Sequence, residues 1–205
     1  MRRSVELLIE YQRLWNSCVV RPERAAEVAA RVRRIAENQA KYEAVSAALG
    51  VGRDPEDCIP WEWIGVLHSL ESDCDFRTHL HNGDSLRRRT VHVPKGRPRT
   101  GEPPFTWQAS AEDALAMKGL HQVEAWTIPV MLYYAEAYNG WGYRQRKNCP
   151  TLSPYLWAGT NHYTRGKYVA DGRFSATAVS KQIGAAALLQ RFFQEAPTND
   201  GKKNG

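Results

Sequence analysis

Apolar side chains recur at helical spacing in several separate stretches of this chain, and this recurrence limits the fold more than any other feature. A return of apolar residues every three or four positions favours an amphipathic helix. The pattern is found in residues 5–18, 22–50, 61–71, 110–117, 122–138 and 176–193. With 205 residues the chain is long enough for one domain with a buried core. We therefore expect a single, mainly helical unit.

Residues with known positional preferences mark the ends of these expected helices. Proline is common in the first turn, where its missing N–H removes no hydrogen bond, so Pro22 and Pro60 indicate helix starts. Ser110, with Asp113 three positions later, resembles a capping box and predicts another start. Pro129 falls inside the stretch that follows, where it predicts a kink.

A different pattern follows the helix expected at 61–71. Residues 76–81 alternate in polarity, which is typical of a strand, and Asn82-Gly83 is a strong hairpin signal because a type I′ turn needs positive φ at both central residues. We expect a return strand over 85–93, and then a loop rich in Pro and Gly over 94–104. The expected fold is α+β and mainly α, with one helix that ends directly before a β-hairpin.

Composition and charge restrict the class of partner. Hydrophobic residues make up 42% of the chain and charged residues 24%, which excludes a disordered or collagen-like protein. The net charge of +6 favours a polyanion: nucleic acid, an anionic membrane surface or an acidic cell wall. A basic loop and a second basic group carry much of this charge, namely Arg87, Arg88, Arg89, Lys95, Arg97 and Arg99, and then Arg144, Arg146 and Lys147. A solvated loop is the alternative interpretation.

The cysteines and histidines give no recognised metal or redox motif. No C-x-x-C pair occurs among the cysteines, which are Cys18, Cys58, Cys74 and Cys149, and we expect free thiols. His79 and His81 lie two positions apart, and with His68 or Cys74 they form an alternative zinc set. Packed or surface histidines are the simpler interpretation, so we expect neither a metal nor another cofactor.

Glu71 is the first candidate for chemistry. It follows Ile64 and Leu67 at positions i+7 and i+4, and so shares the apolar face of its helix. It also stands at the helix C-terminus, where the negative end of the helix dipole disfavours a carboxylate. Both effects raise the pKa of a carboxyl group, as a general acid requires near neutral pH. The alternative is an ordinary exposed glutamate at a helix end.

Short motifs around this glutamate resemble a known superfamily. Residues 68–72 (HSLES) resemble the helix-end E-S motif of goose-type lysozymes and soluble lytic transglycosylases, and residues 135–140 (AEAYNG) resemble their A-Y-N-x-G motif. Residues 80–86 (LHNGDSL) with 89–94 (RTVHVP) look like a hairpin of phage and bacterial proteins of the lysozyme family. The similarity covers roughly residues 60–190, and it points to the lysozyme-like superfamily, although the G-L-M-Q segment of the transglycosylases is absent.

This resemblance implies a lysozyme-like fold and an enzyme that cleaves the bond between N-acetylmuramic acid and N-acetylglucosamine in peptidoglycan. It implies that Glu71 protonates the glycosidic oxygen and that Tyr138 lies near the site. Hydrolysis and transglycosylation both stay open, as does a chitosanase- or chitinase-like activity. A basic polyanion-binding protein without catalysis is the non-enzymatic alternative, although no nucleic-acid recognition motif is present.

A second carboxylate would serve as a base or a nucleophile. Asp84 is the leading candidate, because the Asn82-Gly83 turn is expected to place it opposite His81 across the hairpin. Asp73 and Asp75 are closer to Glu71 in sequence and are alternatives. A structural role for Asp84 in the turn is equally open.

Sugar contacts are expected from two groups of residues. Seven Trp and nine Tyr exceed what a core requires, and aromatic rings stack on the apolar face of a pyranose. Aromatic and amide side chains alternate in residues 153–168, a pattern that predicts a groove wall, with a self-packed loop as the alternative. The candidate substrate-binding residues are Thr78, His81, Asn82, Thr90, Tyr138, Asn139, Tyr155, Trp157, Asn161 and Tyr163.

The expected organisation has three parts. Residues 1–50 form helices packed on the core, residues 51–196 form the lysozyme-like catalytic domain, and residues 197–205 form a disordered tail. The N-terminus lacks a signal-peptide pattern, and no stretch is long and apolar enough to span a membrane. We therefore expect a monomer that is made in a host cytoplasm and reaches the wall after release through a lesion made by a holin, as a phage endolysin does.

Overall fold

The computed structural model describes residues 3–145, 151–170 and 172–194, and most of their regular structure is helical. The longer helices are α1 (Val5–Asn16), α2 (Ala25–Ala36), α3 (Gln39–Leu49), α4 (Trp61–Ser72), α5 (Trp107–Met117), α6 (Ile128–Asn139) and α9 (Ala185–Gln194). Shorter pieces are α7 (Gly142–Gln145), α8 (Pro154–Trp157) and the 3-10 turns η1 (Pro22–Arg24), η2 (Pro55–Asp57) and η3 (Leu120–Gln122). The strands β1 (Lys167–Ala170) and β2 (Arg173–Ser175) pair antiparallel. The expected α+β, mainly helical class is confirmed.

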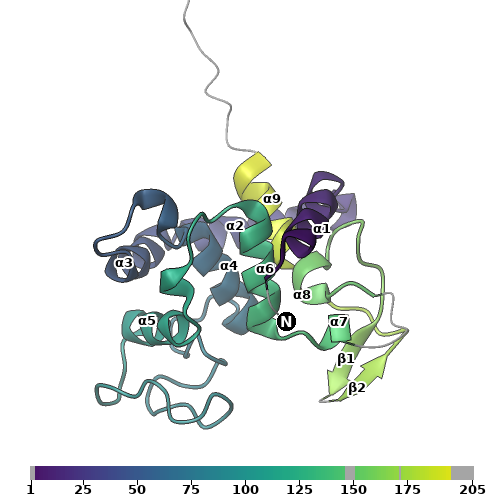
Figure 1. The fold of residues 1–205 in the computed structure, drawn as a ribbon. Coiled ribbons are helices and arrows are strands. Elements are labelled where there is room, and N and C mark those ends of the chain that lie inside the picture. Colours follow the sequence, from purple (N-terminus) through teal and green to yellow (C-terminus); the bar gives the residue numbers. More distant parts are fainter. Residues whose placement is uncertain (1–2, 146–150, 171, 195–205) are drawn as a thin grey trace, which may run out of the picture.

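Helix α4 is the centre of the molecule. Its side chains from Trp63 to Leu70 are all buried, and it packs against α2, α3 and α9. Gly65 permits a close approach of α2, because a Cβ there would lie 2.2 Å from Cγ2 of Ile35. The indole of Trp63 donates to the carbonyl oxygen of Met131 on α6 at 2.9 Å. Figure 1 shows the other helices arranged around this axis. A helix that is apolar on all sides belongs in the core of a domain.

The N-terminal helices pack on this core. Helix α1 lies along α6, and the hydroxyl of Tyr11 donates to the carboxylate of Glu136. Both side chains are buried, with exposed fractions of 0% and 2%. Arg144 donates to Glu136 at 2.8 Å and to Glu10 at 2.9 Å, so the buried carboxylate has a cationic partner. The expected tail at 197–205 lies outside the described residues.

Two of the expected helices begin or break at different places. The stretch 22–50 is split into α2 and α3 at residues 37 and 38, where the amide of Asn38 donates back to the carbonyl oxygen of Arg34 at 3.0 Å. Helix α5 begins at Trp107, because the hydroxyl of Thr106 accepts from the Ala109 N–H at 3.1 Å. Ser110 therefore lies inside the helix, and its prediction as the cap is wrong.

The two later helices are shorter than expected. Helix α6 begins at Ile128, with Pro129 in its first turn, so the predicted kink is wrong. Helix α9 begins at Ala185 and not at residue 176. The residues before it dock against the core: a Cβ on Gly184 would lie 2.4 Å from the carbonyl oxygen of Leu156. Apolar periodicity therefore predicted where these helices lie but overestimated their lengths.

The expected β-hairpin at 76–93 is not formed. Residues 76–106 contain no regular strand, only one isolated bridge between Thr78 and Ser85. Within the Asn82-Gly83 turn only Gly83 has a positive φ, at 78°, so the turn is not type I′. The backbone donors of Val91 and His92 bind the Asp84 carboxylate instead of a neighbouring strand. Side-chain acceptors thus replace the strand ladder in this segment.

The described helices are short. Helices α1, α2, α4 and α6 each have 12 residues, which corresponds to about 18 Å at the rise of an α-helix. In the described part of the chain, no helix combines the length and the apolarity that a membrane span requires.

Candidate active site

Glu71 lies in the last turn of α4, and the chain reverses sharply after it. Asp73 and Cys74 adopt left-handed conformations with φ values of 53° and 56°, which non-glycine residues rarely do. The Asp73 carboxylate is held from α2 by Arg31 at 2.6 Å and by Arg34 at 3.1 Å. These ion pairs contribute to stabilising the conformation in which α4 ends.

The Glu71 carboxyl group is surrounded by protein on most sides, although part of it still reaches solvent. Its Oε1 accepts a hydrogen bond of 2.7 Å from the hydroxyl of Tyr155. Burial raises the pKa of Glu71 to about 6, against the opposing effects of the Tyr155 hydrogen bond and the Lys118 charge. The predicted elevation of the Glu71 pKa is thus supported by the geometry of the site, with burial as its main cause.

Two tyrosines from separate elements line this carboxyl group. Tyr155 comes from α8 and Tyr138 from the last turn of α6, and their exposed fractions are 6% and 8%. The Tyr138 hydroxyl donates to the carbonyl oxygen of Leu80 at 2.8 Å. Burial, together with the nearby Glu71, holds the pKa of both phenols well above the usual value. Both tyrosines therefore stay protonated and act as hydrogen-bond donors.

A lysine that the sequence analysis did not single out completes this group. Lys118 follows directly after α5, with its Nζ 4.5 Å from the centroid of the Tyr138 ring. The Nζ also lies 3.4 Å from the Tyr138 carbonyl oxygen. Burial lowers the pKa of Lys118, whereas the Glu71 charge raises it. From sequence, a lysine at the end of a helix is explained by the helix dipole alone, so it gives no separate signal.

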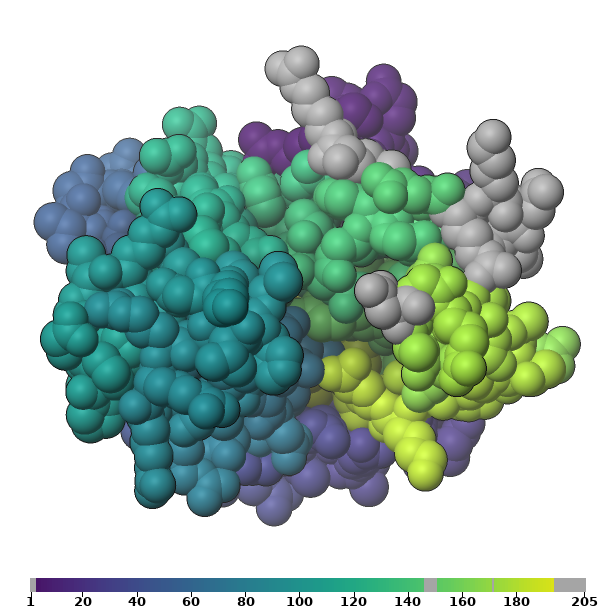
Figure 2. Space-filling view, turned by 90° about the horizontal axis from the view of Figure 1, so that it is seen from below, coloured from purple at the N-terminus to yellow at the C-terminus, as the bar shows by residue number. Residues whose placement is uncertain are grey.

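A surface hollow separates the loop 76–106 from the region of β1 and β2. Figure 2 shows this hollow between residues 76–106, drawn in teal, and the region of β1 and β2, drawn in yellow-green. On the first side, a Cβ on Gly83 would lie 3.5 Å from the carbonyl oxygen of Glu71. The amide of Gln182, in the segment between β2 and α9, donates to the carbonyl oxygen of Leu70 at 2.7 Å. The end of α4 therefore contacts both the loop 76–106 and the segment between β2 and α9.

The structure pairs the predicted second carboxylate with partners other than those expected. Asp84 accepts from the backbone N–H groups of Val91 and His92 at 2.8 and 3.0 Å and from Nδ1 of His92 at 2.7 Å. Burial opposes the effect of these hydrogen bonds, which nevertheless lower the pKa of Asp84 to about 2. The predicted pairing of Asp84 with His81 is wrong. A catalytic role for Asp84 stays a prediction.

His81 belongs instead to a cluster that anchors the loop on α5. Its Nε2 lies 2.8 Å from Oδ2 of Asp113, and Arg97 binds both oxygens of that carboxylate at 2.8 and 2.6 Å. The ring of His79 is also fully used, since Nδ1 contacts Ser110 at 2.7 Å and Nε2 contacts the Arg88 carbonyl oxygen at 2.8 Å. Both histidines therefore hold the loop 76–106 in place.

Three other predicted binding residues in this part of the site make local contacts. Thr78 donates to the carbonyl oxygen of Asp75, Asn82 accepts from the Asp84 N–H, and Thr90 is buried and accepts from the Arg97 N–H. Asn139 is exposed at the end of α6, next to Tyr138. The structure thus brings Tyr138 and Tyr155 to Glu71, and it places the Asn82-Gly83 turn beside the same helix end.

The predicted groove wall at 153–168 is only partly correct. Trp157 has an exposed fraction of 0%, so its ring belongs to the core and the expected sugar contact is wrong. The hydroxyl of Tyr163 donates to Gly166 and accepts from the Ser180 N–H. Asn161 is exposed, but its amide binds the backbone of Ser17 and Val19. Of the predicted residues in this segment, Tyr155 is the one that contacts Glu71.

The alternative zinc set has no support in the geometry. Within residues 3–145, 151–170 and 172–194, no group of three His, Cys, Asp or Glu side chains is arranged to hold a metal. Cys18, Cys58 and Cys74 are free thiols as expected, and Cys149 lies outside the described residues.

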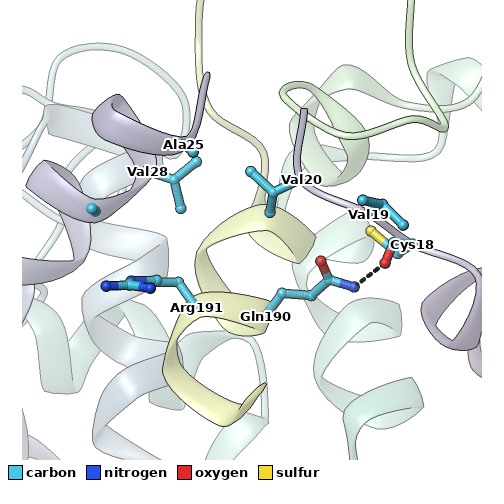
Figure 3. Close-up of a pocket in the computed structure, with 8 residues that line it drawn as sticks. Cys18, Val19, Val20, Ala25, Val28, Gln190 and Arg191 are labelled. Carbon is cyan, nitrogen blue, oxygen red and sulfur yellow. Dashed lines mark hydrogen bonds between the residues drawn. The ribbon is translucent and has the colours of Figure 1, made fainter. Parts of the chain in front are cut away.

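A pocket on another part of the molecule lacks a reactive group. It has a volume of about 510 Å³ and lies between α2 and α9, where Cys18, Val20 and Val28 contribute to its lining. Figure 3 shows Gln190 directed toward Cys18, and its amide donates to the Cys18 carbonyl oxygen at 2.6 Å. Burial raises the pKa of the Cys18 thiol to about 11, so that it is not a nucleophile near neutral pH.

Comparison of the chain with protein-family models, curated proteins and solved structures found no match.

Proposed function

We propose that this chain cleaves the glycosidic bond between N-acetylmuramic acid and N-acetylglucosamine in bacterial peptidoglycan, with Glu71 as the general acid. The observation that carries the proposal is the Glu71 carboxyl group itself. It is partly accessible, its pKa is raised to about 6, and Tyr155 holds one of its oxygens. A lysozyme-like fold is part of the same proposal, supported by a mainly helical domain in which a central helix ends in this glutamate.

The chemistry follows from the protonation state. At pH values below about 6 Glu71 carries a proton, which it donates to the oxygen of the leaving sugar as the glycosidic bond breaks. Tyr155 binds the carboxylate that is left behind, and Lys118 contributes a positive charge beside it. The proton then returns to Glu71 from the water or hydroxyl that attacks the sugar.

A lytic transglycosylase is the second candidate, and the surroundings of Glu71 favour it. Among the described side chains that shift the Glu71 pKa there is no carboxylate, only Tyr155 and Lys118. The Asp84 carboxylate is occupied by His92 and the backbone. A transglycosylase needs no second carboxylate as nucleophile, because a hydroxyl of the substrate attacks and leaves a 1,6-anhydro end.

The decisive experiment is mass analysis of the products from purified peptidoglycan. A reducing end is expected from hydrolysis and a 1,6-anhydro end from transglycosylation, whereas a chitosanase or chitinase would release products from its own polymer and not from peptidoglycan. No release of glycan fragments from any of these polymers would overturn the proposed function and leave the polyanion-binding alternative. Release by a phage lysis system is part of the proposal and would appear as lysis only when a holin is expressed with the chain.

The anionic wall or outer-membrane surface is the proposed partner of the basic loop. Four of its cationic residues are exposed, namely Arg87, Arg88, Lys95 and Arg99, whereas Arg97 is engaged with Asp113 and Arg89 with Glu102. Exposed charges are screened over about 8 Å in physiological salt, so binding should weaken as salt rises. Replacement of the four exposed residues by serine should remove this salt dependence in sedimentation with peptidoglycan. Unchanged sedimentation would make the loop a solvated connection.

A further inference from the structure

Lys118 is a cation without a close acidic partner beside the proposed catalytic acid. Lys118 takes part in none of the ion pairs among the residues that the structure describes, and its side chain is only partly exposed to solvent. Its two close contacts are both neutral: the face of the Tyr138 ring at 4.5 Å and the Tyr138 carbonyl oxygen at 3.4 Å. These contacts restrict the position of the ammonium group but leave its charge unbalanced.

The charge balance changes with the state of Glu71. When Glu71 is ionised, its charge interacts favourably with Lys118. The proposed reaction begins with Glu71 protonated, and in that state the interaction between the two charges is lost. An ammonium group in a partly desolvated site then gains most from an anion carried by a ligand.

We propose that Lys118 determines specificity by binding a carboxylate carried on the lactyl arm of N-acetylmuramic acid. The inference rests on the proposed function and names the feature of the substrate that the site selects. The lactyl arm is attached to carbon 3 of the same ring whose carbon 1 takes part in the bond to be cleaved. A group that binds the arm must therefore lie close to the acid, and Lys118 contacts Tyr138, which lines the site, and interacts electrostatically with Glu71. Polymers of N-acetylglucosamine lack the arm and gain nothing from the lysine.

The carboxylate has two sources in the wall. In glycan strands stripped of peptide, the lactyl carboxylate is free. In intact peptidoglycan the lactyl carboxyl forms an amide with the stem peptide, and the nearest carboxylate belongs to that peptide. Kinetics on peptide-free strands and on intact peptidoglycan separate the two, because Lys118 affects the cleavage only of the polymer whose carboxylate it reaches.

The test uses a pair of substrates that differ only in charge. Peptide-free strands are compared with the same strands after carbodiimide coupling of ammonia has converted each lactyl carboxylate into a neutral amide. Lys118→Gln is expected to lower kcat/KM on the charged strands by roughly tenfold to a hundredfold, mainly through KM, because a hydrogen bond to a charged group is lost. On the amidated strands the variant should show only the change that follows from the altered ionisation of Glu71, which the charged strands share, so that the ratio of kcat/KM between the two substrates falls; Lys118→Arg should retain the preference for charge.

A control variant and the comparison of the two substrates separate specificity from general effects of charge. Arg13→Gln removes one positive charge from an exposed position on α1, which lies on the upper side of Figure 1, whereas the hollow is seen from below. This variant should behave as wild type on both substrates. Loss of Lys118 also removes an interaction that favours ionised Glu71, but that effect acts equally on both substrates. An equal decrease on both substrates, or no decrease, overturns the role of Lys118 in specificity.

A binding experiment distinguishes failure of this inference from failure of the proposed function. Glu71→Gln places a neutral group where the protonated acid would be, and its affinity for charged and amidated strands is measured by calorimetry. Tighter binding of the charged strands, lost in the double variant Glu71→Gln/Lys118→Gln, supports the inference even if the wild type cleaves nothing. Equal affinity for the two kinds of strand, or no binding, overturns it even if the wild type is an active glycosidase.

Discussion

The two sides of the candidate site are held in different ways. The helical side consists of Glu71, Tyr138 and Tyr155, which are fixed by burial of the helices that carry them. The loop side, residues 76–106, lacks regular secondary structure and is fixed by side chains such as Asp84 and Asp113 that bind backbone and cationic groups. A defect on the helical side should therefore alter chemistry with little loss of stability. A defect on the loop side should lower stability first.

The largest effect is expected from Glu71→Gln. The amide keeps the shape of the side chain and can still accept from Tyr155, but it has no proton to donate. General acid catalysis is worth roughly a hundredfold to ten-thousandfold, so clearing of a peptidoglycan suspension should fall by that factor. Retained clearing by a folded variant would exclude Glu71 as the acid.

The same variant tests stability. The pKa of Glu71 is raised from 4.5 to about 6, so its contribution to stability is fully present below pH 4.5 and is lost as pH rises through 6. Above pH 6 the free energy of unfolding of the variant should equal that of wild type or exceed it by at most about 2 kcal/mol, because a tenfold change in an ionisation constant corresponds to about 1.4 kcal/mol. Its melting temperature should therefore be the same or higher. A lower melting temperature at pH 7 would mean that Glu71 is mainly structural.

On the loop side, Asp113→Asn should cause the largest loss of stability. Asp113 binds Arg97 through both oxygens and also contacts His81, and its side chain is only 17% exposed. Breaking such a partly buried ion pair leaves the arginine unbalanced and costs roughly 3 kcal/mol. Glu112→Gln, on the neighbouring residue of α5, is the control, and it should change stability by less than about 0.5 kcal/mol. Chemical denaturation measures both variants, and equal values would contradict the proposed anchoring.

Asp84→Asn should have a smaller effect of the same kind. The amide loses part of the acceptor for Val91 and His92, which should cost about 1–2 kcal/mol. Because the pKa of Asp84 is lowered from 3.8 to about 2, its stabilising effect is present above pH 3.8 and disappears as pH falls through 2. The difference in stability between the variant and wild type should therefore disappear over the same pH range. A hundredfold loss of activity at unchanged stability would instead support the catalytic role predicted from sequence.

The same contrast explains how much the sequence could predict. Glu71 could be placed at a helix end because apolar periodicity and Pro60 define α4. Tyr138 was predicted from the AEAYNG motif, and Tyr155 from the alternation of aromatic and amide side chains in residues 153–168. Lys118 and Gln182 were missed, because their contacts with the site join parts of the chain that are far apart in sequence. No local pattern reports such contacts.

The prediction of a hairpin was wrong for a related reason. The Asn82-Gly83 signal is local, and it was outweighed by side chains that bind across the loop, such as Asp84 with Val91 and Arg97 with Asp113. Turn preferences are worth little against several charged hydrogen bonds. Trp157 shows the same limit, since an aromatic residue in a Gly-rich stretch looks suited to a surface but lies in the core.

The smallest effect is expected from Tyr155→Phe, which probes the helical side without removing the acid. The Tyr155 hydroxyl donates to Glu71 and favours its ionised form, so its loss should raise the pKa of Glu71 above about 6. Because activity requires the protonated acid, the pH at which activity declines should move upward in the variant, while activity at lower pH should fall by less than about tenfold. The expected shift sharpens the contrast between the two sides, since Asp84→Asn should leave this pH unchanged. A profile of initial rate against pH for the wild type and both variants measures it. A decline that moves to lower pH in Tyr155→Phe would show that the tyrosine favours the neutral carboxyl group, and the assignment of Glu71 as an acid tuned by burial against this hydrogen bond would then be wrong.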